Sequence, residues 1–204
     1  LNFADGGAFS VAAKTVHLES TSGKAIEIVT SQGEGIEPTV VDVYAQDSLT
    51  IVGDIRIDAR QGLNQDGYIN IRSGDKSVIR GDIEVINNET SGQVINIGLY
   101  GENSIFEGSI NTRVEPSANA IMLLAEQKEK MQGANVALRE GALWKVTGNS
   151  NVTNIDADGG VIDAGSQKVE IENLNTGNNG TQFKSNSLTK DQIAVANNTG
   201  NGQV

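Results

Sequence analysis

The stretch SLTIVGDIRI (residues 48–57) recurs in modified form as SVIRGDIEV (77–85) and SIFEGSINT (104–112). Its central glycines, Gly53, Gly81 and Gly108, lie 28 and 27 residues apart. An apolar-polar-apolar triplet runs in step with this pattern, as VDV (41–43), INI (69–71) and INI (95–97), and IML (121–123) takes the next place with an apolar central residue. A repeat of this length is typical of architectures built from stacked units.

Each repeat unit reads as a set of short strands separated by turns. Alternation of apolar and polar residues with a period of two indicates strands with one buried face, and clusters of Gly, Asn, Asp and Ser separate them. One unit cannot close a core of its own, but units stacked about 4.8 Å apart share one. The sequence therefore predicts an all-β, right-handed parallel β-helix. At about 27 residues per coil, the 204 residues give about seven coils.

The stacking predicts which side chains lie above one another. A row that faces the core carries most of the stability, because it buries aliphatic side chains. A charged pair and a polar ladder face solvent and contribute little. The core row contains Ile55, Ile83 and Ile110, the pair is Arg56 and Glu84, and the ladder contains Asp42, Asn70 and Asn96.

Residues 117–131 are compatible with two structures. They consist largely of good helix formers, such as AEQKEK (125–130), and taken alone they predict a helix. The repeat register instead places Ile121 and Leu123 in a strand, with residues 126–133 as a loop excursion. We favour the strand, because tertiary context overrides single-residue propensity, and keep a helical or loop excursion at 117–133 as the alternative.

The composition restricts the classes of function. The chain has 24 Gly and 21 Asn, which is turn-rich, and only 4% aromatic residues, so the core must be aliphatic. The absence of Cys excludes disulfides and thiolate chemistry, and a single His excludes a three-histidine zinc site. The net charge of −11 argues against nucleic acid or an anionic membrane as a partner.

We expect one continuous body that belongs to a longer protein. The chain starts at Leu1 without an initiator Met, a basic region or an apolar signal segment. It contains only two prolines, Pro38 and Pro116, and no proline-rich or charged linker. No apolar run of about 18 residues occurs, which argues against a membrane-spanning helix. Residues 1–204 are therefore treated as a single β-helix fragment that is not inserted in a membrane.

The last third of the sequence resembles the passenger domains of pertactin-like autotransporters, which are proteins of type V secretion systems. The resemblance starts with ALWKVTGNSNVTNI (142–155), in which a Trp, a Thr-Gly and a Ser precede a short strand. It continues with DGGVID (158–163), VEIENL (169–174), GTQF (180–183), DQIAV (191–195) and TG (199–200). It covers residues 141–204 by motif, and residues 40–140 only by β-helix periodicity.

This resemblance implies a location and a role. It implies display on the surface of a Gram-negative bacterium, with residues 141–204 as C-terminal coils that lead to a cap and an outer-membrane barrel beyond Val204. It also implies an adhesin or a structural stalk. The implied partner is a host cell-surface or matrix ligand, or a neighbouring bacterial cell, with self-association as one form of contact.

The alternative function is a β-helix enzyme, a lyase or hydrolase that acts on polysaccharide. Asp54 and Asp82 follow equivalent glycines, so stacked coils would bring their carboxylates to about 5 Å, close to the spacing of a retaining glycosidase. The next repeat has Ser109 at this position. A Gly-Asp corner is also ordinary turn chemistry, in which the carboxylate accepts backbone N–H groups. We favour the turn and predict no enzyme activity.

The remaining candidate residues have structural explanations. Alternation in its segment points His17 to solvent, and Trp144 is expected to be the largest core side chain. The DGG triplets at 5–7 and 158–160 lack the nonapeptide periodicity of calcium-binding repeats, so we expect plain turns. No Gly-Asp-Ser-Gly protease motif is present. The sequence therefore assigns no catalytic, cofactor or metal site, and the binding residues stay unassigned.

Overall fold

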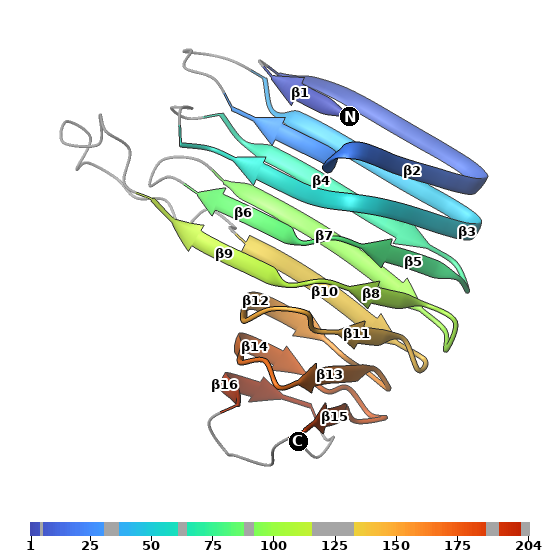
Figure 1. Ribbon diagram of the computed structural model, residues 1–204, viewed down its shortest axis with the longest axis vertical. Coiled ribbons are helices and arrows are strands. Elements are labelled where there is room, and N and C mark those ends of the chain that lie inside the picture. Colours follow the sequence, from blue (N-terminus) through green and yellow to red (C-terminus); the bar gives the residue numbers. More distant parts are fainter. Residues whose placement is uncertain are drawn as a thin grey trace.

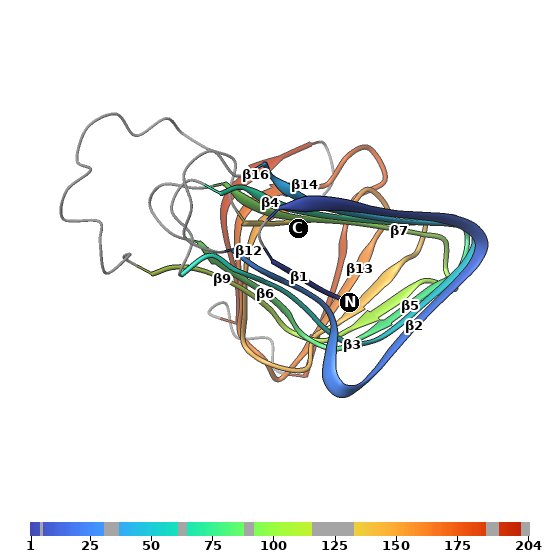
Figure 2. The same cartoon turned by 90° about the horizontal axis from the view of Figure 1, so that it is seen from above.

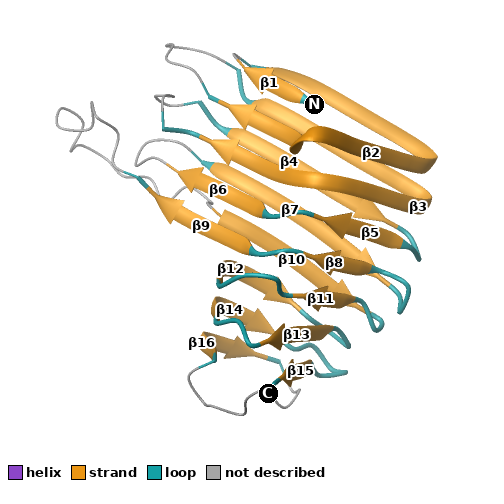
Figure 3. Ribbon diagram, in the orientation of Figure 1, coloured by secondary structure: helices purple, strands orange, loops and turns teal. Residues whose placement is uncertain are grey.

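The chain forms a single stack of β-coils. The computed structural model describes residues 1–4, 6–30, 37–60, 65–87, 92–115, 133–186 and 192–200. Strands β1 to β16 pair in parallel in one continuous sheet that winds around a common axis (Figures 1 and 3). The described ranges contain no helix. The predicted all-β parallel β-helix is confirmed.

The coils have three faces, which we call faces A, B and C (Figure 2). Face A contains β4 (Gly67–Ser73), β7 (Gln93–Tyr100) and β10 (Gly133–Arg139). Face B contains β5 (Ser77–Arg80), β8 (Ile105–Glu107), β11 (Leu143–Lys145), β13 (Val161–Gly165) and β15 (Gln182–Ser185). Face C contains β1 (Asn2–Ala4), β6 (Ile83–Asn87) and β9 (Ile110–Val114).

Longer strands turn the corners and contribute to more than one face. At the N-terminal end, β2 (Gly7–Val29) and β3 (Thr39–Asp58) each run across all three faces. At the C-terminal end, β12 (Ser150–Asp156), β14 (Val169–Asn175) and β16 (Ile193–Thr199) run from face C into face A.

The solenoid is right-handed and has the predicted number of coils. Seen from its N-terminal end in Figure 2, β2 runs clockwise from face A through face B to face C, and the later coils lie further from the viewer. Within the described residues, face B is crossed seven times, by β2, β3, β5, β8, β11, β13 and β15.

The predicted rows of side chains are present. Ile55, Ile83 and Ile110 lie in register in successive coils and are fully buried. On the outside of face C, the Nε atom of Arg56 lies 2.8 Å from the Oε2 atom of Glu84. The interior is thus an aliphatic stack, in which each fully buried Ile contributes about 1.5–3 kcal/mol relative to an exposed side chain.

The corner between faces B and C requires glycine. Gly81 has a φ angle of +141°, and a Cβ there would lie 2.4 Å from the carbonyl oxygen of Gly53. A Cβ at Gly108 would lie 2.0 Å from the carbonyl oxygen of Gly81. Stacking therefore brings backbone against backbone at this corner, which explains the glycine repeat in the sequence.

The coil length is not constant. Along face A, equivalent residues of successive coils from Asp42 onward are separated by 28, 26, 39, 19, 19 and 24 residues. The position predicted for Ile121 and Leu123, beside β7, is occupied by Ala134 and Val136 of β10. That prediction is wrong, because the spacing of 26 residues does not continue past β7. Residues 117–131 themselves lie outside the described residues.

Candidate binding surface

A ladder of hydrogen-bonded polar side chains runs down the outside of face A. In each step, the Nδ2 group of an Asn donates to the side-chain oxygen of the preceding coil, over 2.6–3.0 Å. This amide ladder consists of Asp42, Asn70, Asn96, Asn135, Asn154, Asn173 and Asn197. Its predicted first part, Asp42 to Asn96, is confirmed.

The amide ladder offers further hydrogen-bonding capacity to solvent or to a partner. An Asn side chain has two N–H donors and two oxygen lone pairs. Asn96 and Asn135 each use one donor and one lone pair within the ladder. A second donor and a second lone pair are therefore not used within the ladder, and they recur at the strand spacing of about 4.8 Å.

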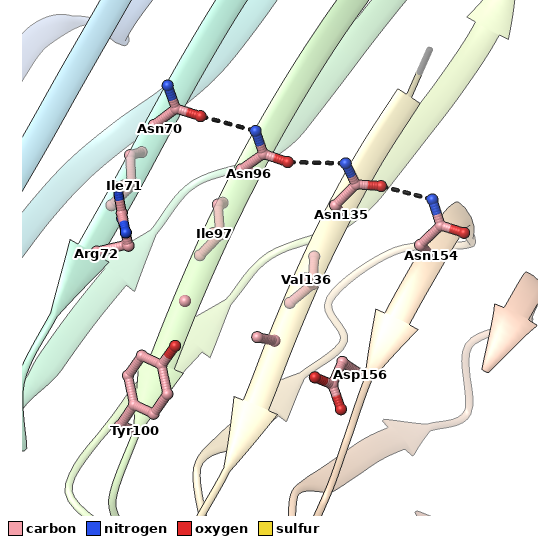
Figure 4. Close-up of a pocket in the computed structure, with 12 residues that line it drawn as sticks. Asn70, Ile71, Arg72, Asn96, Ile97, Tyr100, Asn135, Val136, Asn154 and Asp156 are labelled. Carbon is pink, nitrogen blue, oxygen red and sulfur yellow. Dashed lines mark hydrogen bonds between the residues drawn. The ribbon is translucent and has the colours of Figure 1, made fainter. Parts of the chain in front are cut away.

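An open hollow of about 400 Å³ lies beside the amide ladder, over β4, β7, β10 and β12 (Figure 4). Gly98 and Ala137, which are paired on β7 and β10, are the smallest residues that line it. The amide ladder borders one side of the hollow, and Arg72, Tyr100 and Asp156 lie on the other side.

The ring of Tyr100 lies along the sheet because residue 98 has no side chain. A Cβ at Gly98 would lie 3.1 Å from the Cε2 atom of the ring and 3.3 Å from its hydroxyl oxygen. Figure 4 shows the half-buried ring nearly face-on, on the same side of the sheet as Asn96 and Asn135. The hollow therefore has a flat aromatic surface at one end.

The charges next to this ring largely compensate each other. Arg139 of β10 forms an ion pair with Asp156 of β12, and this hydrogen bond raises the pKa of the guanidinium group. Asp156 also accepts a hydrogen bond from the side chain of Asn175 at 3.4 Å. The hollow is thus lined mainly by neutral groups, with the exposed Arg72 at its edge.

All three tyrosines of the chain lie on face A. Tyr44 is 49% exposed and is paired in register with Arg72. The hydroxyl group of Tyr68 lies 3.4 Å from a carboxylate oxygen of Asp66. Burial, followed by the charge of Asp66, raises the pKa of Tyr68. The tyrosines and the amide ladder thus share one face.

Face B presents charges instead of amides. The Nζ atom of Lys145 lies 2.7 Å from a carboxylate oxygen of Glu107, and Arg80 approaches the same carboxylate at 3.5 Å. The hydrogen bond from Lys145 and the contacts of Arg80 hold the pKa of Glu107 below its ordinary value.

Face C carries a denser network of ion pairs, in its N-terminal coils. Arg56 lies 3.6 Å from Glu27, 2.9 Å from Asp58 and 2.8 Å from Glu84. Burial alone would raise the pKa of Asp58. The hydrogen bonds from Arg60 and the charges of Arg60 and Arg56 outweigh this effect, so the pKa lies below its ordinary value.

The two aspartates considered as catalytic carboxylates bond the backbone of the next coil. The Oδ1 atom of Asp54 accepts the N–H of Asp82, and that of Asp82 accepts the N–H of Ser109, both over 2.8 Å. The expected bond to a backbone N–H is confirmed. The donor, however, belongs to the following coil rather than to the same corner.

The predictions for His17 and Trp144 are confirmed. The His17 side chain is 57% exposed and lies 3.3 Å from a carboxylate oxygen of Glu19. Trp144 is fully buried and stacks on Phe106, with ring centroids 5.9 Å apart. Its indole N–H donates to the carbonyl oxygen of Gly108 over 3.0 Å. Trp144 thus connects the core to the glycine corner.

The structure describes the Asp of only one of the two DGG triplets. Asp158 lies in a turn, as expected, and its carboxylate accepts the backbone N–H groups of Asn178 at 3.1 Å and Asn179 at 2.8 Å, which belong to the following coil. Asp5 lies outside the described residues.

Within the described ranges, no group of three acidic or histidine side chains is placed to hold a metal ion. The same ranges contain no helix long and apolar enough to cross a membrane.

Sequence reasoning missed the lower part of the amide ladder and the tyrosine beside it. Asn135, Asn154 and Asn173 each precede an apolar residue that faces the core. An asparagine before an apolar residue is a weak signal alone, and these asparagines do not recur at the spacing of about 27 residues that the repeats have. Gly98 and Tyr100 are two residues apart in one strand, which places them on one face. A glycine and a tyrosine on the same face of one strand were therefore the sequence signal from which the hollow could have been predicted.

Comparison with known proteins adds no functional information. No family model, no curated protein and no solved structure matches this chain. The resemblance of residues 141–204 to pertactin-like passengers therefore rests on its motifs and stays a prediction.

Proposed function

We propose that this chain is a segment of an autotransporter passenger, displayed on the surface of a Gram-negative bacterium, and that it acts as an adhesin or structural stalk. Face A is its contact surface in this proposal. The partner is a ligand on a host cell or its matrix, or a neighbouring bacterial cell. The motif resemblance of residues 141–204 supports the location.

The amide ladder is the observation that carries the proposal. From Asn70 onward it gives face A an ordered row of neutral amides. Faces B and C have ion pairs in the equivalent outer rows, whereas the Arg139–Asp156 pair of face A lies outside the ladder. Side chains that are already held in place lose less conformational entropy when a partner binds. Tyrosines flank this row. Tyrosine is enriched at protein interfaces, and most charged residue types are depleted there.

A contact role also fits the shape better than catalysis does. The hollow on face A is open to solvent, whereas small-molecule sites usually enclose most of their ligand. Asp54 and Asp82 use carboxylate oxygens to hold the next coil. Stacked coils make long, regular surfaces that suit contact over a large area.

Fluorescent beads coated with the purified chain test this proposal. Attachment to epithelial cells, to matrix-coated plates and to bacteria carrying the same chain is counted for the parent and two variants. The face A variant carries Tyr44→Ser, Arg72→Ser and Tyr100→Ser. The matched face B variant carries Arg80→Ser, Ile105→Ser and Lys145→Ser. We expect attachment by the parent and the face B variant, and loss in the face A variant.

Three outcomes contradict the proposal. Attachment to none of the surfaces excludes an adhesive role for this chain, and equal attachment of both variants excludes face A as the contact surface. Release of soluble sugar fragments from pectin or another polysaccharide by the purified chain favours the enzyme instead. Circular dichroism of the three proteins checks that all of them are folded.

A further inference from the structure

We propose that the hollow beside the amide ladder binds a short stretch of a neutral, hydroxyl-rich oligosaccharide. This inference rests on the proposed function and deepens it by naming the ligand class of face A. It is carried by three features that meet in one place, namely a flat aromatic ring, a row of amides and a floor of small residues.

The aromatic ring provides a surface for the apolar face of a sugar. Its π-face is negative, and the C–H groups of a pyranose carry a small positive charge, so the two attract each other while apolar area is buried. Tyr100 has this orientation because Gly98 leaves the space that a Cβ would occupy, 3.1 Å from the ring. The sequence thus holds the ring flat on the sheet instead of upright in solvent.

The amides provide partners for hydroxyl groups. A hydroxyl group is both a donor and an acceptor, and so is the amide of Asn. Asn96 and Asn135 are fixed relative to each other by a 2.8 Å hydrogen bond, and each retains a donor and a lone pair beyond those of the ladder. Because the ladder crosses the strands, an unbranched oligosaccharide would lie across β7 and β10, parallel to the solenoid axis.

The size and charge of the hollow restrict the ligand further. Its volume of about 400 Å³ and its open side suit a short stretch of a longer chain rather than a ligand that is enclosed completely. Arg72 and Asp156, the charged residues that line the hollow, have opposite charges, and Arg139 pairs with Asp156 at the edge. The chain carries a net charge of −11, which repels acidic polysaccharides at a distance. A neutral ligand is therefore favoured.

A larger hollow among the described residues lacks this combination. It measures about 490 Å³ and lies over β12, β14 and β16. Glu170 and Glu172 line it, and its described lining residues include no aromatic ring. The hollow on face A is thus the better candidate for a sugar.

Isothermal titration of the purified chain with cellotetraose, maltotetraose and chitotetraose tests the inference, with tetragalacturonate as an acidic probe. We expect at least one neutral probe to bind, and to bind more tightly than tetragalacturonate. Tyr100→Ala removes the ring and Ala137→Leu fills the floor, so each should weaken binding by about tenfold or more. Ala194→Leu, at an exposed alanine of face C, is the matched control and should bind like the parent.

Binding of none of the neutral probes overturns the inference, as does equal binding by Ala137→Leu and the parent. Tighter binding of tetragalacturonate also overturns it. Unchanged circular dichroism and thermal unfolding of the variants exclude loss of fold as the cause. Attachment of beads through face A without binding of the oligosaccharides refutes this inference alone. Binding of the oligosaccharides without attachment of beads refutes the adhesive role alone.

Discussion

The N-terminal and C-terminal coils solve the same stacking problem with different lengths of chain. Between β3 and β7, one coil takes 26 to 28 residues, and β4, β5 and β6 are separate strands. Between β10 and β14, one coil takes 19 residues. The C-terminal coils are shorter at the corner from face C to face A, where residues 88–92 separate β6 from β7, whereas β12 continues without a break. They are slightly longer at the corner from face B to face C, where Val169 follows Ile162 by 7 residues and the equivalent Ile83 follows Ile79 by 4.

The two kinds of coil nevertheless keep the same register. The amide ladder continues from Asn96 through Asn135 to Asn154, although the spacing changes from 39 to 19 residues there. The buried row of face B continues likewise from Phe106 through Trp144 to Ile162. Stacked side chains and backbone pairing therefore set the register, and the corners absorb the differences in coil length.

The largest expected effect tests whether the interiors of both kinds of coil are equivalent. Ile83→Asp in an N-terminal coil and Ile162→Asp in a C-terminal coil each place a carboxylate where no solvent reaches. Each should cost at least about 4 kcal/mol and prevent stable folding, as measured by urea unfolding. Glu84→Ala and Asp163→Ala, on the outer side of the same strands, should be close to neutral. Tolerance of one buried aspartate but not the other would show that one end lacks a tight core.

The next effect distinguishes the corners between faces B and C. At Gly81, a Cβ would lie 2.4 Å from a backbone oxygen, and the φ angle is +141°. At Gly148, the nearest atom is the Cβ of Ser109 at 3.3 Å. Gly81→Ala should therefore lower the free energy of unfolding by about 2–4 kcal/mol, and Gly148→Ala by less than about 1 kcal/mol. Equal losses would mean that both corners are equally tight.

The sequence predicted the N-terminal coils well because their repeats are nearly uniform. Once the glycines of the corner define a spacing near 27 residues, the positions of Ile83 above Ile55 and of Asn96 beside Asn70 follow. The burial of Trp144 also followed, because a lone tryptophan in an aliphatic coil contributes the most apolar area. Its hydrogen bond to Gly108 required knowledge of which corner lies beside it.

The candidate site was only partly predictable. Asn96 was expected in an outward ladder, but Asn135 is 39 residues away, because the chain between β9 and β10 is longer than in other coils. The orientation of Tyr100 depends on the missing side chain of Gly98 in three dimensions. Alternation shows that both residues share a face, but it does not show how a ring lies on it.

The third prediction converts a C-terminal coil into the N-terminal kind. Six Gly and Ser residues inserted after Thr153 should be tolerated, because the N-terminal coils have their connection at this corner. The cost should be about 1–2 kcal/mol, mainly the entropy of closing the added loop. Urea unfolding measures it. The same insertion after Ile97, within β7 and paired on both sides, should prevent folding. Loss of folding by the Thr153 insertion would show that continuous strands are required in the C-terminal coils.

The last effect, which disappears at low pH, concerns the ion pairs on face C, which are concentrated in the N-terminal coils. The side chain of Asp58 is 10% exposed, and its pKa is lowered in the folded state mainly by Arg60 and Arg56. A carboxyl group of this kind stabilises the fold above its unfolded pKa of about 3.9. The stabilisation is lost as the pH falls through the lower, folded pKa.

Asp58→Asn should therefore be less stable than the parent at pH 7, by about 1–2 kcal/mol, because it loses hydrogen bonds to charged groups. The difference should shrink as the pH falls below about 4, as urea unfolding between pH 7 and pH 2 measures. Glu170→Gln in β14, whose side chain is 57% exposed and lies 3.2 Å from Lys168, should follow the parent throughout. At low pH, hydrogen exchange should show a loss of amide protection in β3 and β6, whereas β12 to β16 should stay protected. A constant difference at all pH values would mean that the charge of Asp58 does not stabilise these coils.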